Sequence, residues 1–510
     1  MMGGRVHKSV INAEVNLLFY FLSLFLAFFS RKIFLDNLSA DFIGLTGTLG
    51  NILGYLNLAE LGIGSCVSFF LYKPIQAGDR IKIGQILSVL GYLYRCIGFA
   101  MLGAGIVLSL FFPLMFGGEK LGMPIIYFTF YSFLGSSLIS YFINYRQILL
   151  QADQKNYLVA VYFQSAGLVK TAVQIFLAYR YHNLYVWVAI EFMFGLFACI
   201  VLNRKIDKEY PWLRTDKASG RRLLSRYPEI LANTRQIFIH KIKDFVLSKS
   251  DELFIFAFVS LKMVAYYGNY IMITSKITLI FTSVLDSVNA GVGNLVAEGR
   301  KDNMMKVFWE LMTIRHFVAG VLCFSIYYGM EPFISLWLGD KFILDHDILL
   351  MLVIYIYMIN SRGVVDIFNH SHGLYADVWS AWAELAINIT ITIVGGWMYG
   401  ITGILAGKIV SVFAIVIFWK PYYLFTAGLK LPVTQYWNGA VRYYVVFGAA
   451  FAAGTVLEQF IPINPYEGYI QWIGYSVTCL AIFLAVEITG LLLFAKGARD
   501  CIGRIKVFKK

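Results

Sequence analysis

Apolar runs of about 20 residues recur along almost the whole chain and constrain its fold more than any other feature. A helix of that length crosses the hydrocarbon core of a bilayer, since each residue adds about 1.5 Å. Of the 510 residues, 59% are hydrophobic and 14% are charged, whereas soluble domains carry about 25% charge. We therefore expect an all-α polytopic membrane protein, because helices satisfy their own backbone groups in lipid.

The apolar runs predict about fourteen transmembrane helices and a division of the chain into four parts. These parts are an N-lobe at 1–202 with helices 1–6, a basic cytoplasmic inter-lobe linker at 203–236, a C-lobe at 237–425 with helices 7–12, and accessory helices 13–14 with a basic cytoplasmic tail at 426–510. The helices are expected near 11–30, 42–71, 85–113, 124–149, 157–178, 184–202, 237–258, 263–294, 306–330, 347–369, 378–397, 400–425, 438–457 and 469–494.

Two short motifs recur six helices apart. Gly62-Ile63-Gly64 near the end of the second helix matches Gly291-Val292-Gly293 in the eighth, and Ala152-Asp153 matches Ala376-Asp377. An even number of helices per repeat keeps the orientation in the membrane. The motifs therefore favour two parallel six-helix repeats related by an axis along the membrane normal, an arrangement typical of transporters.

Basic residues are concentrated on one predicted side of the membrane. The linker at 203–236 holds nine Lys and Arg residues, whereas the opposite segment 331–347 is acidic. By the positive-inside rule both termini are cytoplasmic, in agreement with an even number of helices. Basic cytoplasmic loops also explain the net charge of +13 without any nucleic-acid partner.

The seventh predicted helix carries charges that a span normally excludes. A charge at the bilayer centre costs about 2.5–3.5 kcal/mol. Helical periodicity places Lys241, Asp244, Ser248 and Asp251 within an arc of about 80°, with Lys249 beside it. Lys241 and Asp244 can lie at the cytoplasmic interface, and Lys249 and Asp251 can form ion pairs. The functional alternative is an aqueous cavity that holds an anionic headgroup.

Further charges lie within predicted spans. Snorkelling to a cytoplasmic interface accounts for Arg146, whereas Lys170 and Lys276 lie well inside their helices and are expected to face a cavity. Acids in the spans can balance these cations or carry protons. Glu60, beside the Gly62 kink, is the first candidate for coupling or gating, and the alternative is that it pairs with a lysine. Such acids are Glu14, Glu60, Glu191, Asp286, Glu384 and Glu487.

No motif for chemistry is present in the sequence. It contains no P-loop, HExxH or GxSxG pattern, the six cysteines show no ligand spacing, and His370-Ser371-His372 is too sparse for a metal site. We therefore expect a protein that is not an enzyme and binds no cofactor or metal.

Several segments resemble the bacterial polysaccharide flippases of the multidrug/oligosaccharidyl-lipid/polysaccharide exporter superfamily. The resemblance covers the whole chain, and its motifs are loose hydrophobic patterns. The similar segments are Phe29-Ser30-Arg31-Lys32-Ile33-Phe34-Leu35-Asp36-Asn37-Leu38, Phe42-Ile43-Gly44-Leu45, Leu56-Asn57-Leu58-Ala59-Glu60-Leu61-Gly62-Ile63-Gly64, Leu71-Tyr72-Lys73-Pro74, Ser250-Asp251-Glu252, Tyr266-Tyr267-Gly268-Asn269-Tyr270 and Gly293-Asn294-Leu295.

The resemblance implies a V-shaped two-lobe transporter of the bacterial inner membrane with a cationic central cavity. Its substrate would be an undecaprenyl-pyrophosphate-linked oligosaccharide, such as an O-antigen or lipopolysaccharide precursor. It would move from the cytoplasmic to the periplasmic leaflet by alternating access. Partners would be membrane lipids, a proton or sodium ion, and polysaccharide polymerase or glycosyltransferase proteins.

Position within these motifs and within the spans selects the candidate site residues. Substrate-binding cations are expected at Lys249, Lys276, Lys170, Arg31, Arg146 and Lys241, and coupling or gating acids at Glu60, Asp251 and Glu14. Two other functions stay open. A cation-coupled multidrug antiporter of the same fold would favour an acidic cavity, and a membrane glycan polymerase or ligase would need a larger outward-facing catalytic segment than 331–347.

Overall fold

The computed structural model describes residues 2–60, 63–216, 219–374 and 376–508, and every regular element in these ranges is a helix. The chain forms two compact units, Met1–Ala265 and Tyr266–Lys510. The predicted all-helical fold is therefore confirmed for the described residues.

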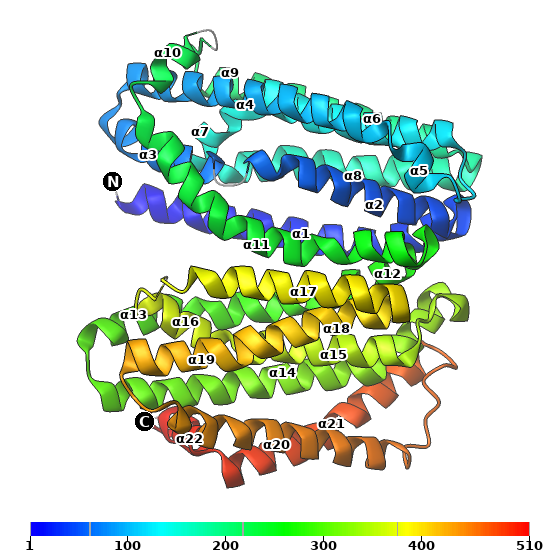
Figure 1. The fold of residues 1–510 in the computed structure, drawn as a ribbon, viewed down its shortest axis with the longest axis vertical. Coiled ribbons are helices and arrows are strands. Elements are labelled where there is room, and N and C mark those ends of the chain that lie inside the picture. Colours follow the sequence, from blue (N-terminus) through cyan, green and yellow to red (C-terminus); the bar gives the residue numbers. More distant parts are fainter. Residues whose placement is uncertain (1, 61–62, 217–218, 375, 509–510) are drawn as a thin grey trace. The chain divides into compact units, whose positions relative to one another are not determined.

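The first unit contains the helices before residue 266 and is coloured from blue to green in Figure 1. Its elements are α1 (Met2–Leu38), α2 (Ala40–Leu56), η1 (Asn57–Glu60), α3 (Ile63–Ala77), α4 (Arg80–Ser109), α5 (Phe112–Phe116), α6 (Met123–Ile143), η2 (Asn144–Arg146), α7 (Gln147–Ala152), α8 (Asn156–Tyr181), α9 (Leu184–Glu209), α10 (Gly220–Leu224), α11 (Pro228–Phe258) and the first residues of α12 (Leu261–Leu285).

The second unit contains the rest of α12 and all later helices. Its further elements are η3 (Asp286–Val288), α13 (Asn289–Glu298), α14 (Lys301–Leu338), η4 (Asp340–Phe342), α15 (His346–Ser361), α16 (Gly363–Ser371), α17 (Val378–Tyr399), α18 (Ile401–Ser411), the π-helix η5 (Val412–Trp419), α19 (Lys420–Tyr423), the π-helix η6 (Leu424–Leu429), α20 (Val433–Glu458), α21 (Tyr469–Phe494) and α22 (Lys496–Phe508).

Eleven helical segments among the described residues are long and apolar enough to cross a membrane. The three other predicted spans correspond to α2–η1–α3, α11 and α12–η3–α13, which are also helical. Together these segments account for the predicted fourteen helices, and the protein is a multi-pass membrane protein.

Charged residues did not end the helices at the predicted linker. The α9 helix continues through basic residues to Glu209, and α11 already begins at Pro228, so the connection is shorter than 203–236. Charge marks the membrane edge, whereas a helix can continue beyond it into water. The predicted lobes and linker concern the transport architecture and stay a prediction.

Each unit breaks a helix at a corresponding place. In the first unit, the 3₁₀ turn η1 separates α2 from α3 and ends at Glu60. In the second unit, the 3₁₀ turn η3 separates α12 from α13 and begins at Asp286. Each break thus carries an acid, close to the glycine motif that predicted the repeat.

The second repeated motif also has the same chemistry in both units. Asp153 accepts a hydrogen bond from the Tyr210 hydroxyl at 2.9 Å and pairs with Lys155 at 2.8 Å. Asp377 accepts from the Trp419 indole at 3.1 Å and pairs with Lys420 at 2.7 Å. In both cases an acid that precedes a helix binds one lysine and one aromatic donor.

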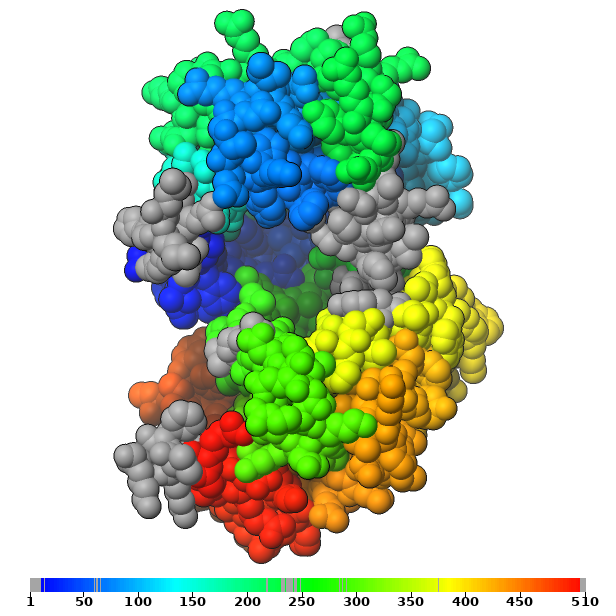
Figure 2. Space-filling view, turned by 90° about the vertical axis from the view of Figure 1, so that its left-hand side faces the viewer, coloured from blue at the N-terminus to red at the C-terminus, as the bar shows by residue number. Residues whose placement is uncertain are grey.

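The C-terminal helix α22 packs on α14 within the second unit. Arg504 pairs with Glu310 at 2.7 Å, and Ala498 is buried in the apolar core next to Phe308. Figure 2 shows the end of the chain, in red, beside the first part of α14, in light green. The basic residues Lys496 and Arg499 stay exposed on the other side of α22.

Candidate functional site

In the first unit, the charged helix α11 packs along α2. Just beyond the end of α11, a Cβ atom at Gly44 of α2 would overlap the carbonyl group of Leu261, the first residue of α12. Further along, the Asn51 amide donates to the Glu252 carboxylate at 2.5 Å, and Tyr55 packs edge-on against Phe245 with ring centroids 5.3 Å apart. The contact therefore has a charged centre between apolar ends.

Two cations act on the Glu252 carboxylate. Arg31 of α1 and Lys249 of α11 both interact with it electrostatically, and Asp251 adds a like charge. The Arg31 guanidinium also donates to the carbonyl oxygen of Ala265 at 2.8 Å. The structure thus brings Arg31, Lys249 and Asp251, three of the predicted site residues, into one polar cluster with Asn51 and Glu252. We call this the α2–α11 cluster.

Glu60 lies at the helix break and accepts hydrogen bonds from two tyrosines. The Tyr94 hydroxyl of α4 lies 2.8 Å from Glu60 Oε1, and the Tyr141 hydroxyl of α6 lies 2.7 Å from Oε2. The same Tyr141 hydroxyl lies 2.8 Å from the Asn57 side-chain oxygen. Both tyrosines are buried, so the carboxylate is bound by neutral donors from two other helices. The lysine partner that the sequence left open is not among these contacts.

The α2–α11 cluster and the Glu60 site lie on one continuous segment of chain. Asn51 and Asn57 are six residues apart, which is about 9 Å along a helix. The α2–η1 segment therefore carries polar side chains over about 9 Å of a predicted span, where the hydrocarbon core measures about 30 Å.

Two predicted site cations hold ion pairs inside the first unit. Lys170 of α8 pairs with Glu191 of α9 at 2.5 Å. Arg146 pairs with Asp207 at 2.6 Å and donates to the Asn203 side chain at 2.9 Å. An acid neutralises each of these cations, which therefore present a weaker field to a ligand than an exposed cation does.

The predicted site residues differ in burial. Within the α2–α11 cluster Lys249 is exposed and Asp251 is buried, whereas Glu14 is exposed on α1 and Lys276 is half-buried on α12 in the second unit. The side chain of Lys241 lies outside the described residues, so its predicted role stays a prediction.

Sequence reasoning missed Glu252, Tyr94 and Tyr141. Glu252 follows Phe245 by seven residues, so helical spacing places both on the face that contacts α2. That spacing was a usable signal for Glu252. Tyr94 and Tyr141 lie 34 and 81 residues from Glu60, and no local pattern connects them.

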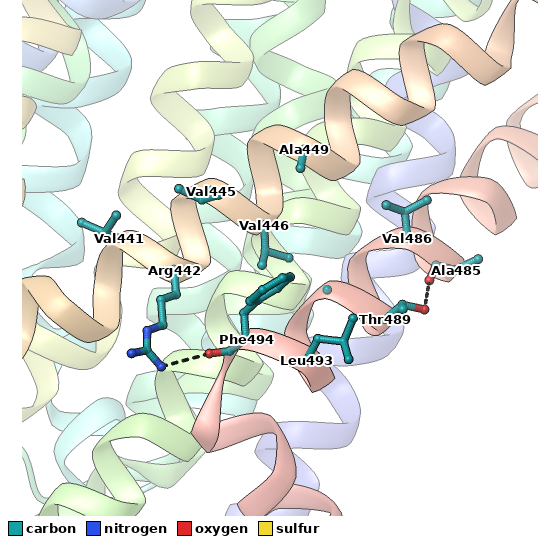
Figure 3. A pocket seen from close by; sticks show the side chains of 11 residues that line it. Val441, Arg442, Val445, Val446, Ala449, Ala485, Val486, Thr489, Leu493 and Phe494 are labelled. Carbon is teal, nitrogen blue, oxygen red and sulfur yellow. Dashed lines mark hydrogen bonds between the residues drawn. The ribbon is translucent and has the colours of Figure 1, made fainter.

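The second unit contains an apolar groove between its last two long helices. Figure 3 shows side chains of α20 and α21 around this space, with Arg442 at one end. The groove has a volume of about 580 Å³, and among its lining residues Arg442 carries a charge. Its guanidinium donates to the carbonyl oxygen of Phe494 at 3.3 Å.

Two solved structures are similar to this chain. Lipid II flippase MurJ in an inward closed conformation has a TM-score of 0.65 and 12% sequence identity, over 95% of this chain and 100% of that chain. An inward-facing multidrug resistance MATE family transporter of the MOP superfamily has a TM-score of 0.59 and 14% identity, over 82% and 98%. No protein-family model and no curated protein sequence matches the chain.

The chain has the fold of these two solved proteins. The similarity covers almost the whole chain, so it includes both units. At 12–14% identity it shows the fold alone. The superfamily fold that the sequence resemblance implied is thereby confirmed, whereas the polysaccharide flippase family and its substrate belong to the proposal below.

Proposed function

We propose that this protein is a flippase that moves an undecaprenyl-pyrophosphate-linked oligosaccharide from the cytoplasmic to the periplasmic leaflet of the bacterial inner membrane. It would act by alternating access in cell-surface polysaccharide biosynthesis, next to polymerase or glycosyltransferase proteins. The observation that carries this proposal is the polar α2–η1 segment. Polar side chains within a membrane-spanning segment are stable where they face a water-filled path, and such a path is what a hydrated substrate needs.

The α2–α11 cluster supports binding of the pyrophosphate. Arg31 lies in the membrane-length segment Glu14–Leu38, and Lys249 lies in the span predicted at 237–258. Phosphate oxygens form strong charge-assisted hydrogen bonds with both side-chain types. We assign the pyrophosphate to these two residues, and Lys276 of the second unit stays a predicted substrate-binding cation. Lys170 and Arg146 would contribute after release of their acidic partners.

The groove between α20 and α21 supports binding of the lipid part. A polyprenyl chain is entirely apolar, and the groove offers valine, alanine and leucine side chains along two helices (Figure 3). Arg442 at one end is suited to a phosphate group, since a guanidinium binds phosphate oxygens in pairs.

Glu60 supports proton coupling in the same proposal. Its partners Tyr94 and Tyr141 are neutral hydroxyl donors, and they stabilise a carboxylate less than a lysine does. A hydroxyl group can turn from donor to acceptor, so these partners suit an acid that carries a proton. A sodium ion would need additional oxygen ligands in place of the two donated hydrogens.

The test is transport of a labelled undecaprenyl-pyrophosphate oligosaccharide in proteoliposomes. The double variant Lys249→Gln/Lys276→Gln should lose most of the flipping rate, because the pyrophosphate loses two cations. Lys301→Gln, an exposed lysine at the start of α14, is the matched control and should keep the wild-type rate. Full transport by the double variant would refute the assigned site.

The same variants separate the proposal from a multidrug antiporter, to which the similarity with a MATE family transporter gives weight. Drug cations do not need Lys249 or Lys276, so an antiporter would keep its activity in the double variant. Export of cationic drugs with no transport of the lipid-linked glycan would favour that second function.

A further inference from the structure

We infer that the second unit contains a binding site for a phosphate-bearing anion, formed by Arg315 and Arg362. The site is independent of the flippase proposal, because it uses none of the residues assigned there. It occupies a pocket of about 460 Å³, and ligand pockets commonly measure about 300–1,000 Å³. The pocket is therefore large enough for a small ligand.

Two interruptions of regular helix meet at this pocket. One is the turn η3 between α12 and α13, which contributes Asp286, and the other is the junction of α15 and α16, which contributes Arg362 and Gly363. Arg315 reaches the pocket from α14. Side chains of several helices thus converge on one space, with two guanidinium groups among them.

The Arg315 side chain is buried, whereas the side chain of Asp286, which pairs with it, is half exposed. The Arg315 side chain is 6% exposed and pairs at 2.5 Å with Asp286, whose side chain is 53% exposed. A Cβ atom at Gly363 would lie 2.5 Å from the Arg315 guanidinium, so the guanidinium packs closely on the backbone at this glycine. The half-exposed carboxylate of Asp286 can turn towards solvent, whereas the guanidinium is buried at the pocket wall.

The two arginines keep donors for a ligand. A guanidinium has five N–H donors. Within the described part of the chain, Arg315 uses one of them on Asp286, and Arg362 forms an ion pair with Asp366 at 3.5 Å, beyond a good hydrogen bond. A ligand with several acceptor oxygens can therefore replace Asp286 and bind both arginines.

A phosphate or pyrophosphate group fits these donors best. Its oxygens accept pairs of hydrogen bonds from planar guanidinium groups, and its charge exceeds that of the single carboxylate it displaces. Two guanidinium groups disfavour a metal cation at the same place. The phosphate can belong to a free anion or to a lipid headgroup, since both present the same oxygens.

The ligand and Asp286 compete for the guanidinium of Arg315, so substitutions of the arginines and of Asp286 should change the ligand affinity in opposite directions. In isothermal titration of the detergent-purified protein with inorganic pyrophosphate, Arg362→Gln should weaken binding about tenfold or more, which is the loss of one charged hydrogen-bonded contact. Asp286→Asn should instead tighten binding, because it removes the competing carboxylate. Arg315→Gln should abolish binding at this pocket, and Arg362→Gln remains the test if the buried Arg315→Gln variant does not fold.

Arg499→Gln is the matched control, since Arg499 is exposed on α22 and does not line this pocket. It should leave pyrophosphate affinity unchanged. Native mass spectrometry after incubation with phosphatidic acid vesicles tests the lipid source, and retention of the lipid that depends on Arg362 would assign a headgroup. The inference is overturned if neither ligand binds through Arg362, or if Asp286→Asn weakens pyrophosphate binding.

Discussion

At the scale of single residues, Glu60 combines a charge within a predicted span with neutral partners. Glu60→Gln keeps one acceptor oxygen for a tyrosine hydroxyl, and its NH₂ group can donate to the other hydroxyl. The variant removes the titratable group, and the fold should survive. We expect the flipping rate to fall about tenfold and to lose its dependence on a proton gradient, as for the loss of one charged hydrogen-bonded contact. Transport in proteoliposomes with and without an imposed pH gradient measures this effect.

Tyr141→Phe provides the comparison for Glu60. It removes one of the two donors but leaves the carboxyl group, so transport should slow while its dependence on the proton gradient remains. If Glu60→Gln transports as the wild type does under a pH gradient, Glu60 has no part in coupling.

The carboxyl group of Asp377 should make the stability of the folded protein depend on pH. Burial alone would raise the pKa of its carboxyl group, but hydrogen bonds from Lys420, Trp419 and Ser380 lower this pKa below the ordinary 3.8. The stabilisation is therefore fully present above about pH 4 and is lost as the pH falls through the lower pKa of the folded state.

Asp377→Asn should cost about 1–2 kcal/mol at pH 7, since Lys420 is partly exposed and solvent weakens the pair. Thermal unfolding in detergent should show this difference at pH 7 and a smaller one near pH 3. Asp302→Asn, at an exposed acid, should show little difference at either pH. A difference that grows on acidification would contradict the assignment.

At the scale of elements, α17 and α18 cross with their backbones in contact. A Cβ atom at Gly403 would overlap the carbonyl group of Gly395, so the two helices must separate to admit alanine. Gly403→Ala should destabilise the protein by about 1–3 kcal/mol, the usual range for overpacking. Gly448→Ala on α20 meets no neighbour and should be neutral or stabilising by up to about 1 kcal/mol. Unfolding midpoints of the two variants test the contrast.

Hydropathy predicted where the helices lie along the sequence, but it did not predict how long each helix is. The span predicted at 306–330 lies inside α14, which continues from Lys301 to Leu338. Hydropathy measures transfer into lipid, and a helix continues beyond the bilayer as long as its backbone bonds are satisfied. Breaks such as η1 and η3 were indicated by glycine motifs, because glycine tolerates a change of backbone direction.

At the scale of the whole molecule, the distribution of charge predicts the orientation in the membrane. Single cysteines at Lys301 and Lys341, both exposed, should react differently with a membrane-impermeant maleimide added to intact spheroplasts. In a background without the native cysteines, Lys341→Cys should be labelled from outside and Lys301→Cys only after permeabilisation. Labelling in the reverse order would invert the orientation and the proposed direction of transport.

Composition and hydropathy were enough to predict that this protein is helical and spans a membrane many times, since transfer of apolar side chains into lipid depends on local sequence. Two short motifs also indicated a repeat. The partners of the charged side chains became known only from the folded structure. Lys170 pairs with Glu191, Arg315 with Asp286, and Glu60 binds Tyr94 and Tyr141. These choices depend on how each helix is rotated about its axis and which helices it meets, and contacts between distant segments set both.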